Sequence, residues 1–225
     1  MKKILVILMV FVSALAAAQD WNKYEVFAGG GMANAKSDAG MMNAIPHFQV
    51  GIKYRVGLSQ GWGETGLLQY QGLYLNAGLT LLNKGHEWKV NKYGGDPKET
   101  FDGSIKALYI DFPLHFGYLL NVSDKVSVFA EGGGYVGLGL TGKFKGTIAY
   151  DGRVLEEYSN NCFSTDDDSP TVHRTEYGVG IAGGVDINGN VTITVGHDWG
   201  FSKYGSEFFL SPQHRKIYLT VGYRF

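Results

Sequence analysis

The sequence has little cysteine, proline or charge. Of its 225 residues one is Cys, 5 are Pro and only 18% are Asp, Glu, Lys or Arg. A single cysteine excludes a disulfide framework and a metal site built from several cysteines. The formal net charge is −1 and no basic run follows the N-terminus, which excludes a nucleic-acid partner. With 44% hydrophobic residues and almost no net charge, the chain is not of the disordered class.

Glycine and aromatic residues are abundant instead. The chain has 33 Gly and is 14% aromatic, whereas glycine averages roughly 7% of residues. Aromatic residues favour β-strands, and stretches rich in Glu and Lys that would favour helices are missing. The composition therefore predicts an all-β protein.

The first 18 residues have the three parts of a secretory signal peptide. Lys2 and Lys3 are followed by an apolar run over residues 4–12 and by three alanines at 16–18. The apolar run is shorter than the roughly 20 residues of a membrane-spanning helix, and no later segment is longer. We expect an exported protein with a signal peptide at 1–18 and a single domain at 19–225.

Beyond residue 19 the dominant pattern is alternation of apolar and polar residues. In the last segment Leu219 and Val221 fall on one face, and Thr220 and Gly222 on the other, as in a strand with one apolar face. The same alternation marks eight segments: 24–33, 48–56, 73–81, 108–118, 126–140, 177–187, 191–201 and 217–225. Three consecutive glycines make the first of these the weakest.

The connections between segments alternate in length. Residues 121–125 and 188–190 read as tight turns, while 85–103, 142–175 and 203–215 are long links. The link 59–71 is longer than this scheme expects. Short turns on the periplasmic side and long loops outside are typical of outer-membrane barrels. We therefore predict an eight-stranded antiparallel transmembrane β-barrel with an up-and-down meander, located in the outer membrane and contacting its lipid.

The polar face decides between a membrane barrel and a soluble one. It is rich in glycine and carries few charged residues, whereas charged residues usually make up roughly 25–35% of a solvent-facing surface. A lumen of eight strands is just wide enough for side chains to fill, and buried charges need partners. We predict a closed lumen with a charge network made of these residues: Lys53, Arg55, Asp111, Glu131, Asp186, Asp198 and Arg224. Selection of a permeating solute is the alternative role for these charges. A soluble, lipocalin-like barrel that binds an apolar ligand is the alternative fold.

Aromatic residues gather near the segment ends, as two interfacial girdles would require. One expected girdle contains Trp21, Tyr24, Tyr118, Tyr223 and Phe225, and the other contains Trp199, Phe201 and Tyr204.

Several short motifs carry a family resemblance. They are Tyr223-Arg224-Phe225, the strand Leu108-Tyr109-Ile110-Asp111-Phe112-Pro113-Leu114, Asn76-Ala77-Gly78-Leu79 with Lys84-Gly85, and Glu131-Gly132-Gly133. Together they resemble the PorT-like outer-membrane β-barrel proteins of Bacteroidetes. The resemblance implies an outer-membrane barrel, with a link to protein secretion for some members. It also implies that Tyr223 and Phe225 act as an insertion signal read by the barrel-assembly machinery.

One segment brings together residue types found in hydrolases. His197, Asp198 and Ser202 are close in the sequence, and a hydrolase needs a nucleophile and a base within hydrogen-bond reach. In a regular strand, however, His197 faces lipid while Asp198 and Ser202 face the lumen. A lipid-modifying hydrolase is therefore the second alternative, and we expect no enzyme activity.

Metal and cofactor sites have little support. Asp166, Asp167 and Asp168 lack the spaced ligands and the glycine of a calcium loop. The six histidines show no close pairing of the kind that zinc sites use. Cys162 is a lone thiol in the longest link. We expect neither a metal nor a cofactor.

The link 142–175 is the best candidate for a working surface. Residues 143–150 and 153–158 flank Asp151-Gly152, which reads as a hairpin turn. We expect two strands that project above the membrane, carry a tip at 160–169 and contact an extracellular or envelope protein.

Overall fold

The computed structural model describes residues 23–37, 40–58, 71–91, 95–96, 98–163, 172–202 and 213–225. Among them, no helix is long and apolar enough to cross a membrane. The predicted signal peptide at 1–18 lies outside the described residues, as do Trp21, Tyr204, Asp166, Asp167 and Asp168 and most of the link 59–71.

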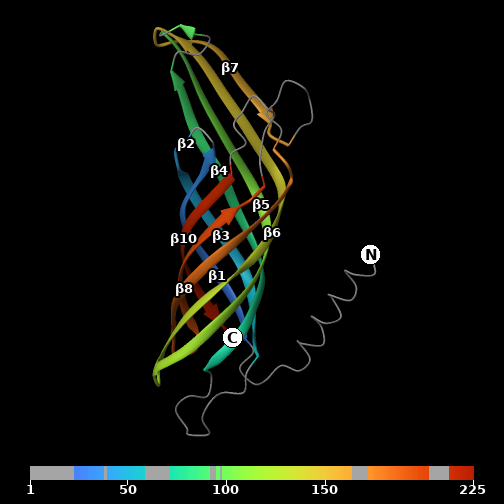
Figure 1. Cartoon of the computed structure of the whole chain (residues 1–225), viewed down its shortest axis with the longest axis vertical. Helices are drawn as coiled ribbons and strands as arrows, with labels where there is room; N and C mark the ends of the chain where they lie inside the picture. Colours follow the sequence, from blue (N-terminus) through green and yellow to red (C-terminus); the bar gives the residue numbers. More distant parts are fainter. Residues whose placement is uncertain are drawn as a thin grey trace, which may run out of the picture.

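Ten antiparallel strands form one sheet, and eight of them close into a ring (Figure 1). The strands of the ring are β1 (Lys23–Ser37), β3 (Ile45–Gly57), β4 (Gly72–Asn91), β5 (Glu99–Ser123), β6 (Val126–Tyr150), β8 (Thr175–Ile187), β9 (Val191–Gly200) and β10 (Gln213–Arg224). β2 (Gly40–Met41) pairs with β1, and β7 (Arg153–Asn161) pairs with β6. The prediction of an eight-stranded meander is confirmed.

The ring closes between the first strand and the last. β1 and β10 pair from Glu25 opposite Arg224 to Lys36 opposite Gln213. Closure leaves neither strand with an unpaired edge along this stretch, which is how barrels avoid exposed backbone groups in lipid.

Two hairpins turn through left-handed residues. Asn188 and Gly189 have φ of 52° and 70°, and Asp151 and Gly152 have φ of 47° and 79°. Positive φ at both central residues is what a type I′ hairpin turn requires, and Asn-Gly and Asp-Gly are the pairs that adopt it most readily. Both predicted turns are confirmed, and with them the strands on either side of Asp151-Gly152.

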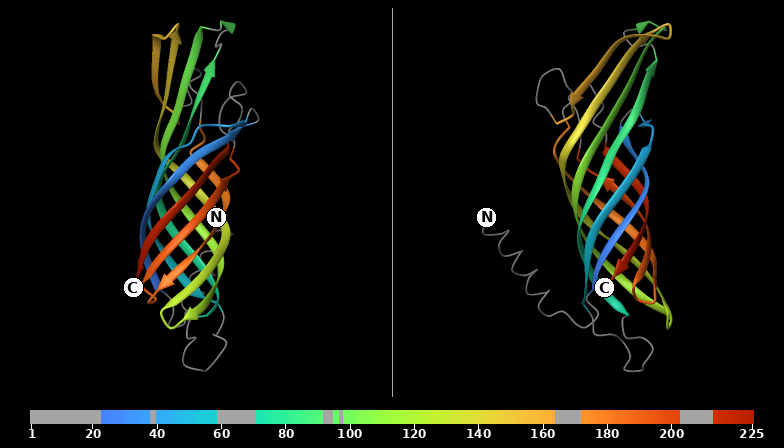
Figure 2. Two further views of the ribbon diagram at one scale, coloured as in Figure 1. Left: turned by 90° about the vertical axis from the view of Figure 1, so that its left-hand side faces the viewer. Right: turned by 180° about the vertical axis from the view of Figure 1, so that it is seen from behind.

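The predicted loop at 85–103 is largely wrong. β4 continues to Asn91 and β5 begins at Glu99, and the two strands pair from Gly85 opposite Lys106 to Asn91 opposite Thr100. The link 142–175 likewise contains strand: β6 runs to Tyr150, and β7 folds back along it. The distal parts of β4, β5 and β6, at residues 85–91, 99–106 and 143–150, thus form with β7 a sheet that projects beyond the barrel (Figure 2). We call it the projecting sheet.

Strand length explains the projection. β5 and β6 have 25 residues each, whereas a tilted strand crosses a bilayer with about 9–11 residues. β8, β9 and β10 have 13, 10 and 12 residues, which is little more than one crossing of the bilayer requires. The surplus of roughly 15 residues in β5 and β6 corresponds to about 50 Å of extended strand. This length cannot be accommodated within the membrane.

Along the barrel the apolar side chains point outward and the charged ones inward. Large hydrophobic residues that are exposed include Phe48, Leu114, Phe116, Ile181, Val195, Leu219 and Val221. Buried charged residues include Glu25, Arg55, Asp111, Glu131, Asp186 and Arg224. A soluble barrel has the opposite arrangement, so the lipocalin-like alternative is wrong.

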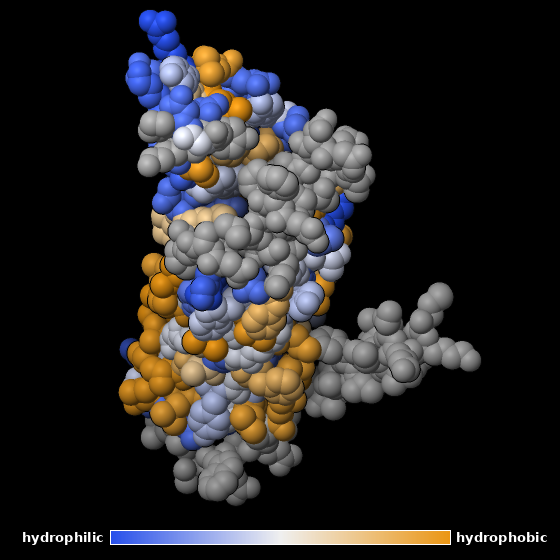
Figure 3. All heavy atoms as spheres, turned by 45° about the horizontal axis from the view of Figure 1, so that its top comes forward, coloured by the Kyte–Doolittle hydropathy of each residue, from blue (hydrophilic) through white to orange (hydrophobic). Residues whose placement is uncertain are grey.

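The outer face changes character beyond the barrel. Outward positions on β5 are apolar from Leu120 up to Leu108, and the next outward residues are Lys106 and Ser104. On β6 the apolar series ends at Leu140, next to a β-bulge, and Lys143 and Lys145 follow. The space-filling view shows mainly hydrophobic residues over the lower part of the molecule, and mainly hydrophilic ones with some hydrophobic residues among them over the projecting end (Figure 3).

Candidate functional site

Arginines and carboxylates fill the end of the lumen nearest the C-terminus. Asp186 Oδ2 accepts hydrogen bonds from Arg55 Nη1 at 2.7 Å and from Arg224 Nη1 at 2.6 Å. Arg224 Nη2 also lies 2.8 Å from Glu25 Oε2. The Arg55 guanidinium packs over the Tyr74 ring, 4.3 Å from its centroid. One carboxylate on β8 thus holds two guanidinium groups, one from β3 and one from β10.

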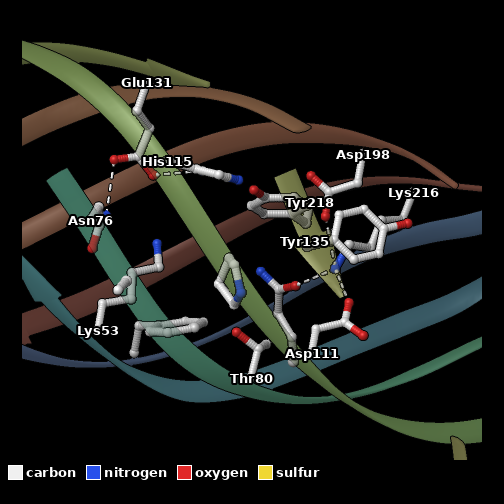
Figure 4. Close-up of a pocket in the computed structure, with 14 residues that line it drawn as sticks. Lys53, Asn76, Thr80, Asp111, His115, Glu131, Tyr135, Asp198, Lys216 and Tyr218 are labelled. Atoms are coloured by element: carbon white, nitrogen blue, oxygen red, sulfur yellow. Dashed lines mark hydrogen bonds and ion pairs between the residues drawn. The ribbon is translucent and has the colours of Figure 1, made fainter. Parts of the chain in front are cut away.

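A second group in the lumen centres on Glu131. Its Oε2 accepts hydrogen bonds from Tyr74 Oη and Asn76 Nδ2, each at 2.9 Å. Its Oε1 lies 3.3 Å from His115 Nδ1. Figure 4 shows the Glu131 carboxylate with Asn76 and His115 reaching toward it.

A third group closes the lumen toward the projecting sheet. Lys84 Nζ contacts Asp111 Oδ2 at 2.9 Å and Glu176 Oε1 at 3.1 Å. Glu176 also accepts from Tyr135 Oη at 2.6 Å. Lys216 Nζ lies 3.0 Å from Asp198 Oδ2 and 3.7 Å from Asp111 Oδ2. Lys84 and Lys216 therefore link three carboxylates that come from three strands.

Six of the seven predicted lumen residues thus take part in the three polar groups, and Tyr74 connects the first group to the second through its ring and its hydroxyl. Lys53, the seventh, has its ammonium 4.6 Å from the centroid of the Phe27 ring. Sequence reasoning missed Glu25, Lys84, Glu176 and Lys216 as members. Lys84 and Lys216 have the parity of the polar face but lie outside the predicted segments, because these ended at residue 81 and began at residue 217.

The space left inside the lumen is small. A cavity of about 30 Å³ lies between the second and third groups, and another of about 10 Å³ lies beside Lys84 and Glu176. A single water needs roughly 10–15 Å³. These two cavities have room for a few waters and not for a solute.

The projecting sheet has an apolar interior. A cluster of buried residues covers its inner side: Leu82, Phe101, Ile105, Ala107, Tyr109, Phe144, Cys162, Phe163 and Val172. The ring of Trp88 stacks on Phe144 with centroids 6.0 Å apart. The predicted tip at 160–169 is wrong in part, since residues 160 and 161 belong to β7 and Cys162 and Phe163 are buried. Residues 164–171 lie outside the described part.

Burial controls the chemistry of the single cysteine. The Cys162 side chain is 0% exposed. Burial raises the pKa of its thiol to about 11, so the reactive thiolate is rare at neutral pH.

Aromatic residues lie on the outer surface at both ends of the barrel. Tyr24 contacts Tyr54 and Phe225, with ring centroids 4.5 and 6.2 Å apart. At the other end Tyr177 packs against Phe201. Tyr223 and Phe225, the predicted insertion signal, are 55% and 65% exposed.

The residues of the hydrolase hypothesis lie on two faces. Asp198 is buried in the lumen, whereas His197 contacts Trp199 on the outer side, with the two rings tilted and their centroids 4.3 Å apart. Ser202 Oγ accepts a hydrogen bond from the Tyr177 backbone N–H. The three side chains do not form a catalytic arrangement. Within the described residues, no three His, Cys, Asp or Glu side chains are placed to hold a metal ion.

An apolar outside, a polar lumen and a sheet closed on itself define the class of membrane-spanning β-barrels. The model of one family, described as "Outer membrane protein beta-barrel domain", matches residues 17–204. The chain belongs to this family, and the family places it in the outer membrane.

Solved structures of small outer-membrane proteins show low similarity to the chain. Ail of Yersinia pestis is 13% identical, with 91% of this chain and 99% of that one covered and a TM-score of 0.39. Neisserial surface protein A is also 13% identical, with 90% and 97% covered and a TM-score of 0.42. The N-terminal barrel of Pseudomonas aeruginosa OprF is 12% identical, with 90% and 97% covered and a TM-score of 0.33. None of the curated proteins matches the chain.

Proposed function

We propose that the chain is a non-enzymatic surface protein of the outer membrane whose working part is the projecting sheet. The observation that carries this proposal is the reversal of polarity along β5 and β6. Both strands are apolar outside at the level of the barrel and charged outside above it. A sheet with its own buried core, charged outward residues on β5 and β6, and exposed Val154 and Leu155 on β7 is suited to contact a partner in water.

The position of the projecting sheet is tested by labelling whole cells. In a Cys162→Ala background, Arg153→Cys places a thiol beside the turn that joins β6 to β7, and Asp124→Cys places one beside the turn that joins β5 to β6. We expect a membrane-impermeant maleimide to label Arg153→Cys on intact cells and Asp124→Cys only after permeabilisation. The reverse pattern would overturn the proposal.

The barrel is proposed to act as a closed anchor. Support comes from the small cavities and from the buried ion pairs, because open aqueous channels belong to barrels of about 16–18 strands. In planar bilayers the purified protein should give no stable unitary current. Such currents would support the selection of a permeating solute by the lumen charges.

Absence of enzyme activity is part of the proposal. The hydrolase alternative requires that purified protein deacylate outer-membrane lipid and that His197→Ala abolish this activity. We expect neither result, because His197 and Asp198 lie on opposite faces of β9.

Biogenesis and kinship complete the proposal. We expect cleavage after residue 18, which N-terminal sequencing of the mature protein tests. Deletion of Phe225 should reduce insertion by the barrel-assembly machinery, seen as a smaller heat-modifiable fraction on gels.

Kinship with PorT-like proteins and a role in secretion predict that a deletion strain exports fewer proteins. A pull-down from native membranes would identify a partner of the segment 142–175.

A further inference from the structure

Three lysines form a patch on the outer side of the projecting sheet. Lys106 on β5 lies opposite Lys143 on β6, and Lys145 lies two residues further along the same face. Their inward neighbours on β6 are Phe144 and Gly146, which face the apolar interior. The three ammonium groups therefore point away from the core. We call Lys106, Lys143 and Lys145 the lysine patch.

Most of the charge of the lysine patch is not neutralised by the protein. Lys106 Nζ pairs with Glu87 Oε1 at 2.9 Å. Within the described part of the chain, Lys143 and Lys145 form no ion pair shorter than 4.0 Å. Exposed lysines further out on the projecting sheet differ in this respect, since Lys98 pairs with Asp151 and Lys89 with Asp102.

The register makes this arrangement unfavourable without an anion. Residues directly opposite each other in an antiparallel pair have Cβ atoms about 4.5–5.5 Å apart, and like charges there are destabilising. Lys106 and Lys143 are such a pair. An anion bound between them would remove the repulsion and would also attract Lys145.

The patch lies directly above the apolar belt. The outward residues next to it are Leu108 on β5 and Leu140 on β6. Arg174 adds a further cation at this level, where its Nη1 donates to the carbonyl oxygens of Gly139 and Leu140. Lysine stems can lie along apolar surface while their ammonium groups reach the headgroup region. The nearest anions to this position in a bilayer are lipid headgroups.

We propose that the lysine patch binds a phosphorylated headgroup of an outer-leaflet lipid. The phosphate lies between Lys143 and Lys106 and is contacted by Lys145, while the acyl chains pack on the apolar belt below. Such binding fixes the depth and the tilt of the barrel on the side where the projecting sheet leaves the membrane.

The test uses the full chain in detergent micelles, titrated with diphosphoryl lipid A and with the same lipid after removal of its phosphates. Lys143→Gln with Lys145→Gln should weaken binding of the phosphorylated lipid roughly 30-fold, because each lysine near an anionic surface raises the affinity by roughly five-fold and the two factors multiply. Lys98→Gln with Lys125→Gln removes two exposed lysines elsewhere and should leave binding unchanged. Lys143→Arg with Lys145→Arg keeps the charge and should retain affinity.

Several results would overturn the proposal. One is equal affinity for the lipid with and without phosphates, and another is an equal loss in the two glutamine variants. Tight binding of soluble inositol hexakisphosphate with the same dependence on Lys143 and Lys145 would assign the patch to free polyanions instead. Should the glutamine variant not fold, the salt dependence of the wild-type protein decides, because affinity that does not fall with added salt is incompatible with a phosphate site. Binding in micelles is independent of orientation in cells, so its failure is distinct from failure of the labelling experiment.

Discussion

β4, β5 and β6 each pass through two environments, and their side chains are arranged oppositely in the two. Within the barrel Leu114 and Phe116 face outward while Asp111 and His115 are buried. In the projecting sheet Phe101 and Ile105 are buried while Lys106 faces outward. The period of two is the same in both regions. What differs is the solvent, because lipid favours apolar groups outside and water favours them inside.

The two regions are therefore held together by different interactions. Ion pairs and hydrogen bonds occupy the lumen, and their contribution to the stability of the barrel depends on every polar group having a partner. Dispersion and burial of apolar surface hold the projecting sheet. Substitutions in each region should separate these contributions.

The largest effect is expected from Asp186→Asn in the lumen. The change leaves Arg55 and Arg224 facing each other without their shared carboxylate, and removal of one partner of a buried ion pair costs about 3–5 kcal/mol. Urea unfolding in lipid vesicles, followed by tryptophan fluorescence, measures the loss. Asp124→Asn in an exposed turn is the matched control and should change stability by less than about 0.5 kcal/mol. Equal stability of the two variants would show that the lumen pairs contribute little.

A smaller and local effect is expected from Phe144→Ala in the projecting sheet. Phe144 is 6% exposed and stacks on Trp88, so its truncation should cost about 3 kcal/mol. The backbone amide hydrogens at the start of β5 and at the end of β6, which lie in the projecting sheet, should then exchange faster with solvent. Those in the barrel should keep their protection. Thr147→Ala on the outer side of β6 serves as the control. Faster exchange throughout the barrel would mean that the two regions unfold as one unit.

The outer face itself provides a third comparison. Leu114→Arg places a cation in the middle of the apolar belt and should lower stability by about 2–4 kcal/mol. Thr100→Arg lies on the same face of β5 in the projecting sheet, where water solvates the charge, and should change stability by less than about 0.5 kcal/mol. Unfolding in vesicles compares the two variants directly. A similar loss for both would contradict the position of the membrane boundary.

The smallest effect concerns chemistry rather than stability. Cys162 is fully buried and its pKa is raised to about 11, so at pH 8 only about one thiol in a thousand is ionised. Alkylation of the folded protein by iodoacetamide should be at least about 100-fold slower than in urea. Ser159→Cys in a Cys162→Ala background has an exposed thiol and should react rapidly. Mass spectrometry follows both reactions, and rapid modification of Cys162 in the folded protein would show that the projecting sheet opens readily.

The sequence was sufficient to predict the strands that lie in lipid. A glycine-rich polar face and an apolar one, repeated eight times, define both the ring and which side faces outward. The tight turns followed from Asn188-Gly189 and Asp151-Gly152, whose residue types tolerate positive φ.

The sequence was not sufficient above the membrane, for a physical reason. Leu82 and Ile105 are apolar and face inward. In the barrel, by contrast, apolar residues face outward and polar residues face inward. If apolar residues are expected to face outward throughout, the alternation breaks at residue 81, which is why the sequence predicts an end for β4 there although the strand continues to Asn91. Lys84 lies in the part of β4 beyond the predicted segment, and Lys216 lies in β10 before the predicted start at residue 217, because β10 begins at Gln213. Glu176 directly precedes the predicted segment 177–187 and has the parity of its polar face, but no local pattern shows that it meets Lys84, which is 92 residues away.

The bond between Arg224 and Glu25 joins residues that are 199 positions apart. β1 is the first strand of the barrel and β10 the last, so this contact and the pairing of β1 with β10 cannot form until β10 has been synthesised. Such a seam gives the fold a high contact order, and proteins dominated by distant contacts fold slowly. The chain therefore leaves the ribosome with its two edge strands unpaired and must be protected from aggregation until it reaches the membrane.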